Sequence, residues 1–254
     1  MTQGPAIVTI GNFDGVHLGH QELLRQVVDR ARVLGLHSYA VTFDPHPEEV
    51  LYPERGIAVL TSADEKKRLI CGSGIDEVWV CPFTTELSRL EPQEFMRLIS
   101  ERQPIAELWV GADFALGRGR SGTIAVLAEL GAALGWGLHM VPPYRLEGQV
   151  VSSTGIRTLL STGASQGAAE LLGRPYSVDA VLQTDGSLRV EPNRALPRSG
   201  LVYEAQLSQD QRQFEVLVSV APPFVRFEGE HEHALHLDPG PVRLTFLRRL
   251  RTEV

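Results

Sequence analysis

The sequence has only two cysteines, no excess of basic residues and no long hydrophobic run. Cys71 and Cys81 do not form a C-x-x-C pattern, so neither a disulfide framework nor a zinc site is indicated, and a reducing compartment fits. The formal net charge of -7 argues against an extended nucleic-acid surface, because phosphate backbones are bound by clustered lysine and arginine. Any polyanion that this protein binds is therefore expected to be small and held locally.

The N-terminal segment also lacks the features of a signal peptide. MTQGPA leads directly into the apolar run IVTI, without a basic segment and a longer apolar core, and no apolar run approaches membrane-spanning length. We therefore predict a cytoplasmic protein that binds no membrane. With 254 residues, of which 43% are hydrophobic, the chain is long enough for one large domain or two small ones.

Residues 1–176 alternate between strand and helix patterns. Short β-rich runs, typical of buried parallel strands, occur at 7–10, 37–43, 77–83, 107–112 and 138–141. Helical patterns lie between them, at 23–34, 65–71, 90–102 and 122–134. Gly35 is typical of a helix C-cap, and Ser62 with Glu65 is typical of a capping box. This alternation predicts right-handed crossovers and a Rossmann-like, doubly wound parallel sheet.

Residues 177–254 have a different character. They contain β-rich runs separated by Asp-Gly, Pro-Pro and Pro-Gly turns, which predict a small antiparallel, barrel-like β domain. His231, His233 and His236 lie in one polar stretch of this segment. We expect an exposed turn there and no metal site, because no carboxylate or cysteine accompanies the three histidines at a known metal spacing.

The stretch GNFDGVHLGH, residues 11–20, follows the first predicted strand and leads into a helix. The N-terminus of such a helix carries partial positive charge and free N–H groups. Gly11, Gly15 and Gly19 allow a sharp turn or a close approach of the backbone to a ligand. His17 and His20, three residues apart, would share one face and donate hydrogen bonds to phosphate oxygens. The pattern favours a small polyphosphate ligand; in the alternative, one histidine caps the helix and the other packs.

This stretch resembles the H-x-G-H signature of nucleotidyltransferases, which join ATP or CTP to a phosphate-bearing small molecule and release pyrophosphate. Class I aminoacyl-tRNA synthetases carry a related signature, but neither the acidic balance nor the length of this chain suits a tRNA enzyme. VSSTGIR, residues 151–157, is similar to the S-S-T-x-I-R element that completes the triphosphate site in this superfamily. Ser152, Ser153 and Thr154 stand where a helix would begin, and Arg157 supplies a fixed positive charge. In the alternative, this segment is a plain N-cap with a solvated arginine.

Five segments together resemble the bacterial FAD synthetases, the bifunctional riboflavin kinase/FMN adenylyltransferases. They match in order and spacing: TFDPHPEEVL, LTSADEKKRLI, VGADFALGRGRSGT, VSSTGIR and LLGRPY. Leu116 and Gly155 depart from this pattern, because the family commonly has phenylalanine and arginine at these positions. The resemblance implies an ATP site formed by Gly11, Phe13, His17, Gly19, His20, Ser153, Thr154 and Arg157, with His17, His20 and Arg157 catalytic. It implies a flavin site formed by Phe43, Pro45, Asp113, Phe114 and the loop from Gly117 to Gly122, with Arg118 and Arg120.

The chemistry of the residues supports the same reaction. A phosphate monoester such as FMN has its second pKa at about 6, so at neutral pH it attacks the α-phosphorus of ATP without a general base. The site must align two polyanions and neutralise the charge of the leaving pyrophosphate, which His17, His20, Arg157, helix N-termini and a Mg²⁺ ion can do. We predict an enzyme that makes FAD and pyrophosphate from FMN and ATP. Asp14 receives no catalytic role and is as well explained by a turn.

The resemblance covers about the first 180 residues, and the C-terminal domain matches the kinase half of the family by its position after LLGRPY. The family's kinase half has a G-x-P-T-A-N segment that places a threonine and an asparagine on Mg-ATP, and a glutamate base that takes the ribityl hydroxyl proton. Here EPN, residues 191–193, is at most a remnant, and His233 stands where the glutamate is expected. The domain is also shorter, which predicts a barrel remnant and no riboflavin kinase activity. Two other hypotheses remain: a nucleotidyltransferase for another phosphorylated small molecule, and a non-catalytic flavin- or nucleotide-binding regulator.

Overall fold

The computed structural model describes residues 4–229 and 237–250. The chain forms two compact units, of which the first comprises Met1–Ile57 and Ser62–Val150 and the second comprises Ala58–Thr61 and Val151–Val254. We call them the α/β unit and the barrel unit. By packing, residues 151–176 belong to the barrel unit, whereas the sequence places them after the last strand of an α/β domain. The assignment of residues 1–176 to one functional domain, as the family resemblance implies, stays a prediction.

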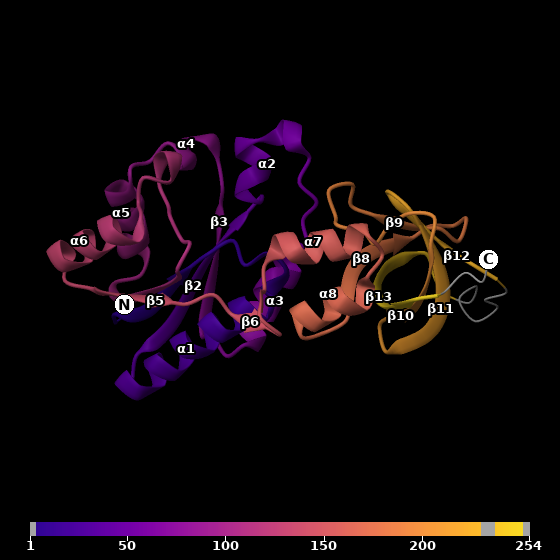
Figure 1. The fold of residues 1–254 in the computed structure, drawn as a ribbon, viewed down its shortest axis with the longest axis horizontal. Coiled ribbons are helices and arrows are strands. Elements are labelled where there is room, and N and C mark those ends of the chain that lie inside the picture. The colour runs from indigo at the N-terminus through magenta and orange to yellow at the C-terminus, as the bar shows by residue number, and fades with distance from the viewer. Residues whose placement is uncertain (1–3, 230–236, 251–254) are drawn as a thin grey trace. The chain divides into compact units, whose positions relative to one another are not determined.

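The α/β unit, drawn from indigo to magenta in Figure 1, is built on a five-stranded parallel sheet with the order β3-β2-β1-β4-β5. Its strands are β1 (Ala6–Ile10), β2 (His37–Asp44), β3 (Glu77–Pro82), β4 (Ile105–Gly111) and β5 (Gly137–Val141). All five residues of β1 are buried, because this apolar strand lies in the middle of the sheet. The strand order reverses beside β1, so the predicted doubly wound sheet is confirmed.

Helices cover both faces of this sheet. One core cluster joins α1 and α3 to β1, and a second joins α5 and α6 to the other sides of β1, β2 and β4. Ser62 caps α3 by accepting from the backbone N–H of Glu65, which is half of the predicted capping box; the Glu65 carboxylate contacts Arg68 instead. The helices of this unit are α1 (Leu18–Leu34), α2 (Pro47–Leu51), α3 (Ala63–Gly72), α4 (Thr85–Ser88), α5 (Pro92–Arg102) and α6 (Ile124–Leu134). The short elements are η1 (Asp14–Val16), η2 (Pro53–Arg55), η3 (Arg118–Arg120), β6 (Arg145–Leu146) and β7 (Gln149–Val150).

The barrel unit contains a closed six-stranded barrel in the order β10-β11-β12-β9-β8-β13. The predicted barrel-like antiparallel domain is confirmed, and closure of its strands leaves no unpaired edge. That this domain is the remnant of a kinase domain stays a prediction. The strand β12 was not predicted. The elements of the unit are α7 (Ser153–Ser161), α8 (Ser165–Leu172), β8 (Tyr176–Leu182), β9 (Leu188–Val190), β10 (Val202–Gln209), β11 (Arg212–Ala221), β12 (Phe224–Phe227) and β13 (Gly240–Arg249).

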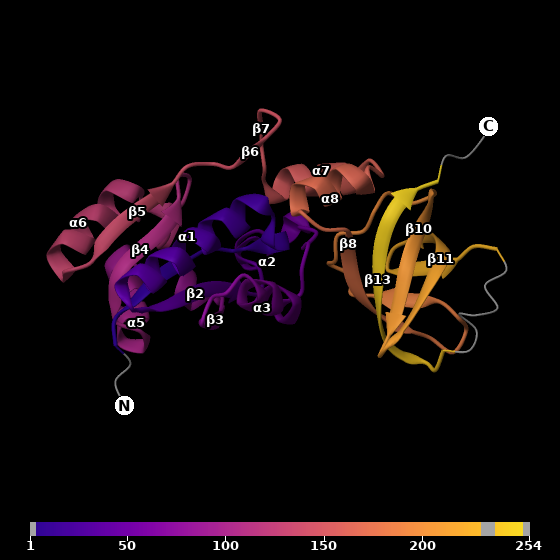
Figure 2. The same cartoon turned by 90° about the horizontal axis from the view of Figure 1, so that it is seen from below.

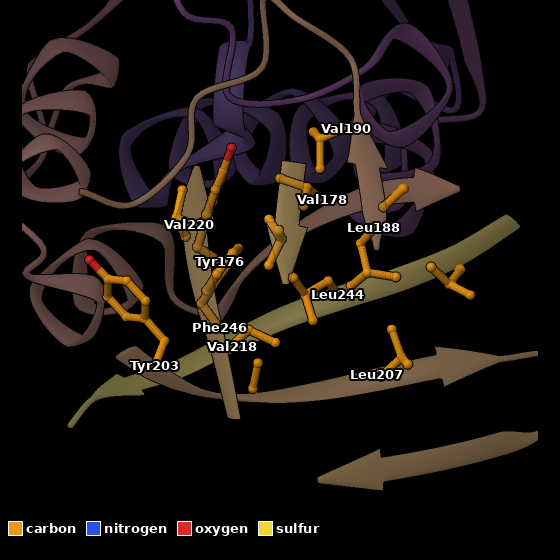
Figure 3. Packing of buried hydrophobic residues seen from close by; sticks show 14 of the residues in the cluster. Tyr176, Val178, Leu188, Val190, Tyr203, Leu207, Val218, Val220, Leu244 and Phe246 are labelled. Carbon is orange, nitrogen blue, oxygen red and sulfur yellow. The ribbon is translucent and has the colours of Figure 1, made fainter. Parts of the chain in front are cut away.

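A single apolar core fills the barrel and continues under its two helices. Inward side chains from all six strands meet there, and Figure 3 shows several of them around Phe246 and Leu244. Ile156 and Leu160 of α7 belong to the same cluster, as do Ala168 and Leu172 of α8. The two helices pack on each other, and α8 packs on β8 and β13 (Figure 2). The helix α7, which begins with the S-S-T-G-I-R segment, therefore packs on the barrel core.

His231, His233 and His236 lie outside the described residues. Within residues 4–229 and 237–250, there is no group of three or more histidine, cysteine, aspartate or glutamate side chains arranged to hold a metal ion. No helix in the described part of the chain is both long enough and apolar enough to span a bilayer.

Candidate active site

The H-x-G-H loop joins the carboxyl end of β1 to α1. Its first residues form η1, and His17 is the N-cap of α1. The His17 Nδ1 atom accepts a hydrogen bond from the backbone N–H of His20 at 3.3 Å. His17 thus caps the helix, as the alternative hypothesis supposes. Because the Nδ1 atom of His17 accepts this hydrogen bond, the neutral ring carries its proton on Nε2.

The two histidines form one stacked unit. Their ring centroids are 3.7 Å apart with an interplanar angle of 15°, and the Phe13 ring meets His20 edge-on at 5.2 Å. A Cβ at Gly19 would lie 3.2 Å from the His17 ring, and a Cβ at Gly11 would lie 3.1 Å from the Phe13 ring. These two glycines therefore make room for the aromatic rings of their own loop, which sequence reasoning did not foresee.

His20 is held as a neutral imidazole. Burial lowers its pKa well below the ordinary value of 6.5, and the charges of His17 and Lys66 lower the pKa further. Its Nδ1 atom is buried and has no hydrogen-bond partner among the described residues. A buried N–H without an acceptor is less tolerated than an unpaired lone pair, so the proton belongs on Nε2. Both rings can therefore offer an Nε2–H to an anion, whose charge would in turn raise the protonated fraction.

This lowered pKa predicts how stability depends on pH. The unfolded chain binds a proton at His20 near pH 6.5 and the folded chain does not, so the free energy of unfolding falls as pH decreases below about 6.5. We expect the Tm of the wild type to decrease between pH 7.5 and 5.5, and to decrease less in His20→Gln. His37→Gln is the control, because the side chain of His37 is 77% exposed. Equal pH slopes in wild type and His20→Gln, measured by thermal unfolding, would contradict a desolvated neutral His20.

Two residues of the same loop have a strained backbone. Phe13 and Val16 have φ values of 48° and 41°, in the left-handed region that disfavours residues with a Cβ. The cost is greatest for a β-branched residue such as Val16, and strain of this kind is about 1–3 kcal/mol per residue. Such strain is characteristic of ligand-binding loops and is consistent with a functional site here.

The loop after β2 is joined to the H-x-G-H loop. The Thr42 hydroxyl donates to the backbone oxygen of Asn12 at 2.9 Å. Phe43 is only 7% exposed and packs against the rings of Phe83 and Phe95, while Pro45, after a cis peptide bond, is exposed. Phe43 can therefore offer a ligand only a small part of its ring, and Pro45 is the more accessible of the two predicted flavin contacts.

Lys66 on α3 is a residue that sequence reasoning missed. It is 3% exposed, and its Nζ donates to the backbone oxygen of Phe43 at 2.6 Å. The positive charge of this buried ammonium lowers the pKa of His20 and so favours the neutral form of that imidazole. One signal was present in the sequence: Lys66 precedes the apolar Ile70 by four residues, which places both on the buried face of the helix.

The loop after β4 carries the other predicted flavin contacts. Leu116 pairs with Gly122 and closes the loop, and Leu116 is buried in the sheet core, so leucine fills the position where the family commonly has phenylalanine. Asp113 is exposed, and its backbone oxygen accepts from Arg120 at 2.8 Å. Arg118, also exposed, forms an ion pair with Glu91 at 2.7 Å.

The loops after β1, β2 and β4 leave the sheet at one edge. These strands are adjacent and parallel, so their carboxyl ends lie together. The structure thus places the histidine pair, the segment around Phe43 and the loop from Asp113 to Gly122 at the same edge of the α/β unit. This is the edge at which doubly wound sheets bind ligands.

The S-S-T-G-I-R segment belongs to the barrel unit. Ser152 is the N-cap of α7, and its Oγ accepts from the backbone N–H of Gly155 at 3.2 Å. The predicted contacts Ser153 and Thr154 begin the helix. The Arg157 Nε donates to the backbone oxygen of Ala58 at 2.6 Å, so this arginine is anchored rather than merely solvated.

Comparisons with known proteins identify the family of this chain. The family model described as FAD synthetase matches residues 1–155. The chain belongs to the FAD synthetase family. It is 36% identical over 173 residues to a bifunctional riboflavin kinase/FMN adenylyltransferase of Pseudomonas fluorescens, a match that covers 68% of this chain and 55% of that protein. It is 30% identical over 199 residues to a FAD synthetase of Listeria monocytogenes, with 77% of this chain and 79% of that protein covered.

This member of the FAD synthetase family spans about half the length of the Pseudomonas relative. Among solved structures, it is similar to a crystal structure described as a macrolide-efflux protein from Streptococcus pneumoniae. The TM-score is 0.83 at 24% sequence identity, and the match covers 100% of this chain and 88% of the other. That likeness shows that the two proteins share a fold.

Proposed function

We propose that this protein transfers AMP from ATP to FMN and so makes FAD and pyrophosphate. The observation that carries the proposal is the stacked pair His17 and His20 at the N-terminus of α1, in a segment that matches the FAD synthetase family. The pair combines two Nε2–H donors with a helix N-terminus, and both attract oxyanions. The loop also has a strained backbone and a desolvated imidazole, and a loop with a purely structural role would need neither of these.

The reaction is an in-line displacement at phosphorus. An oxygen of the FMN phosphate attacks the α-phosphorus of ATP, the new P–O bond forms, and the bond from the α-phosphorus to the bridging oxygen breaks. The electron pair of that bond leaves with pyrophosphate. At neutral pH the FMN phosphate is largely a dianion, so no proton has to be removed. His17 and His20 stabilise charge on the oxygens around the α-phosphorus by hydrogen bonds that are already oriented before reaction.

The ATP site is assigned to the two motifs. Gly11, Phe13 and Gly19 shape the loop that orients the histidines, as the ring contacts described above indicate. Ser153 and Thr154 offer backbone N–H groups at the start of α7 to phosphate oxygens, and Arg157 adds a fixed positive charge. His17, His20 and Arg157 are the proposed catalytic residues.

The flavin site is assigned to the loops after β2 and β4. Pro45 and the edge of Phe43 would contact the ring system together with Phe114, and Asp113 lies at the turn beside them. The loop that begins at Gly117 carries two exposed guanidinium groups suited to a phosphate dianion, those of Arg118 and Arg120.

Mg²⁺ would accompany ATP rather than occupy a site built by the chain. Within the described residues, no three acidic, histidine or cysteine side chains form a group, and Mg²⁺ commonly binds through substrate phosphates and water. When bound, the ion supplies neutralisation of the triphosphate charge, which adds to that of Arg157.

The barrel unit is proposed to lack riboflavin kinase activity. An alcohol needs a general base, and the position where the family has a glutamate is taken here by His233, outside the described residues. The threonine of the kinase motif is also missing from the segment 191–193. One relative is named for both activities and another only as a FAD synthetase, so loss of one activity within the family would not be unusual.

Product analysis tests the first activity. Purified protein incubated with FMN, ATP and Mg²⁺ is expected to give FAD and pyrophosphate, resolved by chromatography. Absence of FAD above a protein-free blank at every Mg²⁺ concentration would refute the proposal. Turnover of a different phosphorylated acceptor would instead identify another nucleotidyltransferase, and binding of FMN and ATP without turnover would identify a regulator.

The missing kinase activity is tested with riboflavin. Riboflavin, ATP and Mg²⁺ are expected to give neither FMN nor FAD, and addition of FMN to the same mixture is expected to restore FAD formation. That restoration is the internal control for active protein. Conversion of riboflavin to FMN by the purified chain would show that the barrel is a working kinase.

A further inference from the structure

Residues 58–61 form a short segment that belongs to the barrel unit, although they lie far from it in sequence. The backbone N–H of Val59 donates to the oxygen of Asn193 at 2.8 Å, and the N–H of Ala195 donates to the oxygen of Val59 at 2.8 Å. Val59 thereby forms a parallel bridge with Arg194. The loop between β9 and β10, which contains the EPN remnant, therefore holds this segment in place.

A buried tyrosine holds the next residue of the segment. The hydroxyl of Tyr176, the first residue of β8, lies 2.7 Å from the oxygen of Ala195 and 3.1 Å from the oxygen of Leu60, and its single proton is shared between these two acceptors. Leu60 is fully buried in the barrel core, beside Ile156 of α7. Backbone pairing of Val59, and the tyrosine hydroxyl and apolar packing at Leu60, thus fix these two consecutive residues.

The first residue of this segment contacts Arg157. The backbone oxygen of Ala58 accepts a hydrogen bond from the Arg157 Nε at 2.6 Å. A guanidinium has a rigid fork of donors, so fixing Nε sets the direction of the whole group. The geometry points to a positioning role for the barrel: Tyr176 and the loop 193–195 orient the catalytic Arg157 through the segment 58–61. This inference rests on the proposed AMP transfer, in which Arg157 contacts the triphosphate.

The test removes the hydroxyl of Tyr176 and compares the effect with removal of the hydroxyl of another buried tyrosine. Tyr176→Phe is expected to lower kcat/KM for ATP about three- to tenfold, the effect of one hydrogen bond, and to leave KM for FMN unchanged. Tyr203→Phe is the control. Tyr203 is buried in the same core and also contacts Phe246, but its hydroxyl donates to the oxygen of Arg198 at 2.9 Å. In Figure 3 the two hydroxyls point to different sides of the core. Tyr203→Phe is expected to keep the wild-type kcat/KM for ATP.

A double-mutant cycle separates positioning from general destabilisation. Arg157→Lys keeps the charge and loses the Nε donor, so adding Tyr176→Phe to it should lower activity no further. Full additivity in this background, or equal losses in the two tyrosine variants, would overturn the inference.

ATP binding by calorimetry distinguishes the failure of this inference from the failure of the proposed function. If the wild type forms no FAD, the proposed function fails, and weaker ATP binding by Tyr176→Phe than by Tyr203→Phe still supports the positioning role. Equal ATP binding by the two variants, or no ATP binding by the wild type, refutes it.

Discussion

His20→Ala is expected to lower kcat for FAD formation by about 10²–10³-fold while KM for ATP changes little. His20 is neutral because it is desolvated, and it gains most when negative charge builds up on the transferred phosphate group. A donor of this kind stabilises the transition state more than it stabilises bound ATP. Steady-state kinetics with ATP and FMN varied in turn measure the two parameters separately.

The control for this variant is His37→Ala. His37 begins β2, at the end of the strand remote from Phe43, and its side chain is largely exposed. We expect wild-type kinetics from it. A loss in His20→Ala that is confined to KM would mean that the histidine only holds ATP in the ground state, and its catalytic assignment would be wrong.

Lys66→Met is expected to lower kcat/KM for ATP by about ten- to a hundredfold without lowering the Tm by more than a few degrees. Burying an ammonium is costly, and an unbranched apolar side chain of similar length can fill the same space, so stability changes little. Activity falls because the positive charge beside the histidine pair is lost and because the carbonyl of Phe43 loses its donor. Thermal unfolding and steady-state kinetics of the same preparation separate the two effects.

Lys67→Met is the matched control, since Lys67 is the adjacent residue of the same helix and is exposed. It is expected to behave as the wild type does. If Lys66→Met is as active as the wild type, the buried ammonium serves packing alone. If Lys66→Met unfolds, Lys66→Arg, which keeps the charge, shows whether the charge or the shape of the side chain is required.

The α/β unit could be predicted well because its signals are local. Each of the five apolar runs became a strand within about two residues of its expected ends, since strands buried on both faces are short and continuously apolar. The first helix ends at Gly35, as its left-handed conformation requires. The start of that helix at Leu18 was less evident, because its first turn carries the histidine motif rather than an apolar repeat.

What the sequence could not predict depends on partners distant in the chain. Nothing in the residues before Ser62 indicates that Val59 pairs with a loop near residue 194. The apolar faces of α7 and α8 fit any core, and only the tertiary structure shows that they cover the barrel. A lysine in a helical pattern usually predicts a solvated side chain, and the four-residue spacing to Ile70 does not show which atoms bury Lys66; its contact with the backbone oxygen of Phe43 requires the tertiary structure.

The segment 58–61 has a consequence for how this chain can be divided. Because it belongs to the barrel unit but lies between two segments of the α/β unit, no single cut separates the two units. A chain truncated before Tyr176 would retain Val59 and Leu60 without the backbone groups and apolar surface that bury them. The barrel is therefore not an exchangeable module: any transplant between relatives has to carry this four-residue insert together with its own β9–β10 loop, as a matched pair.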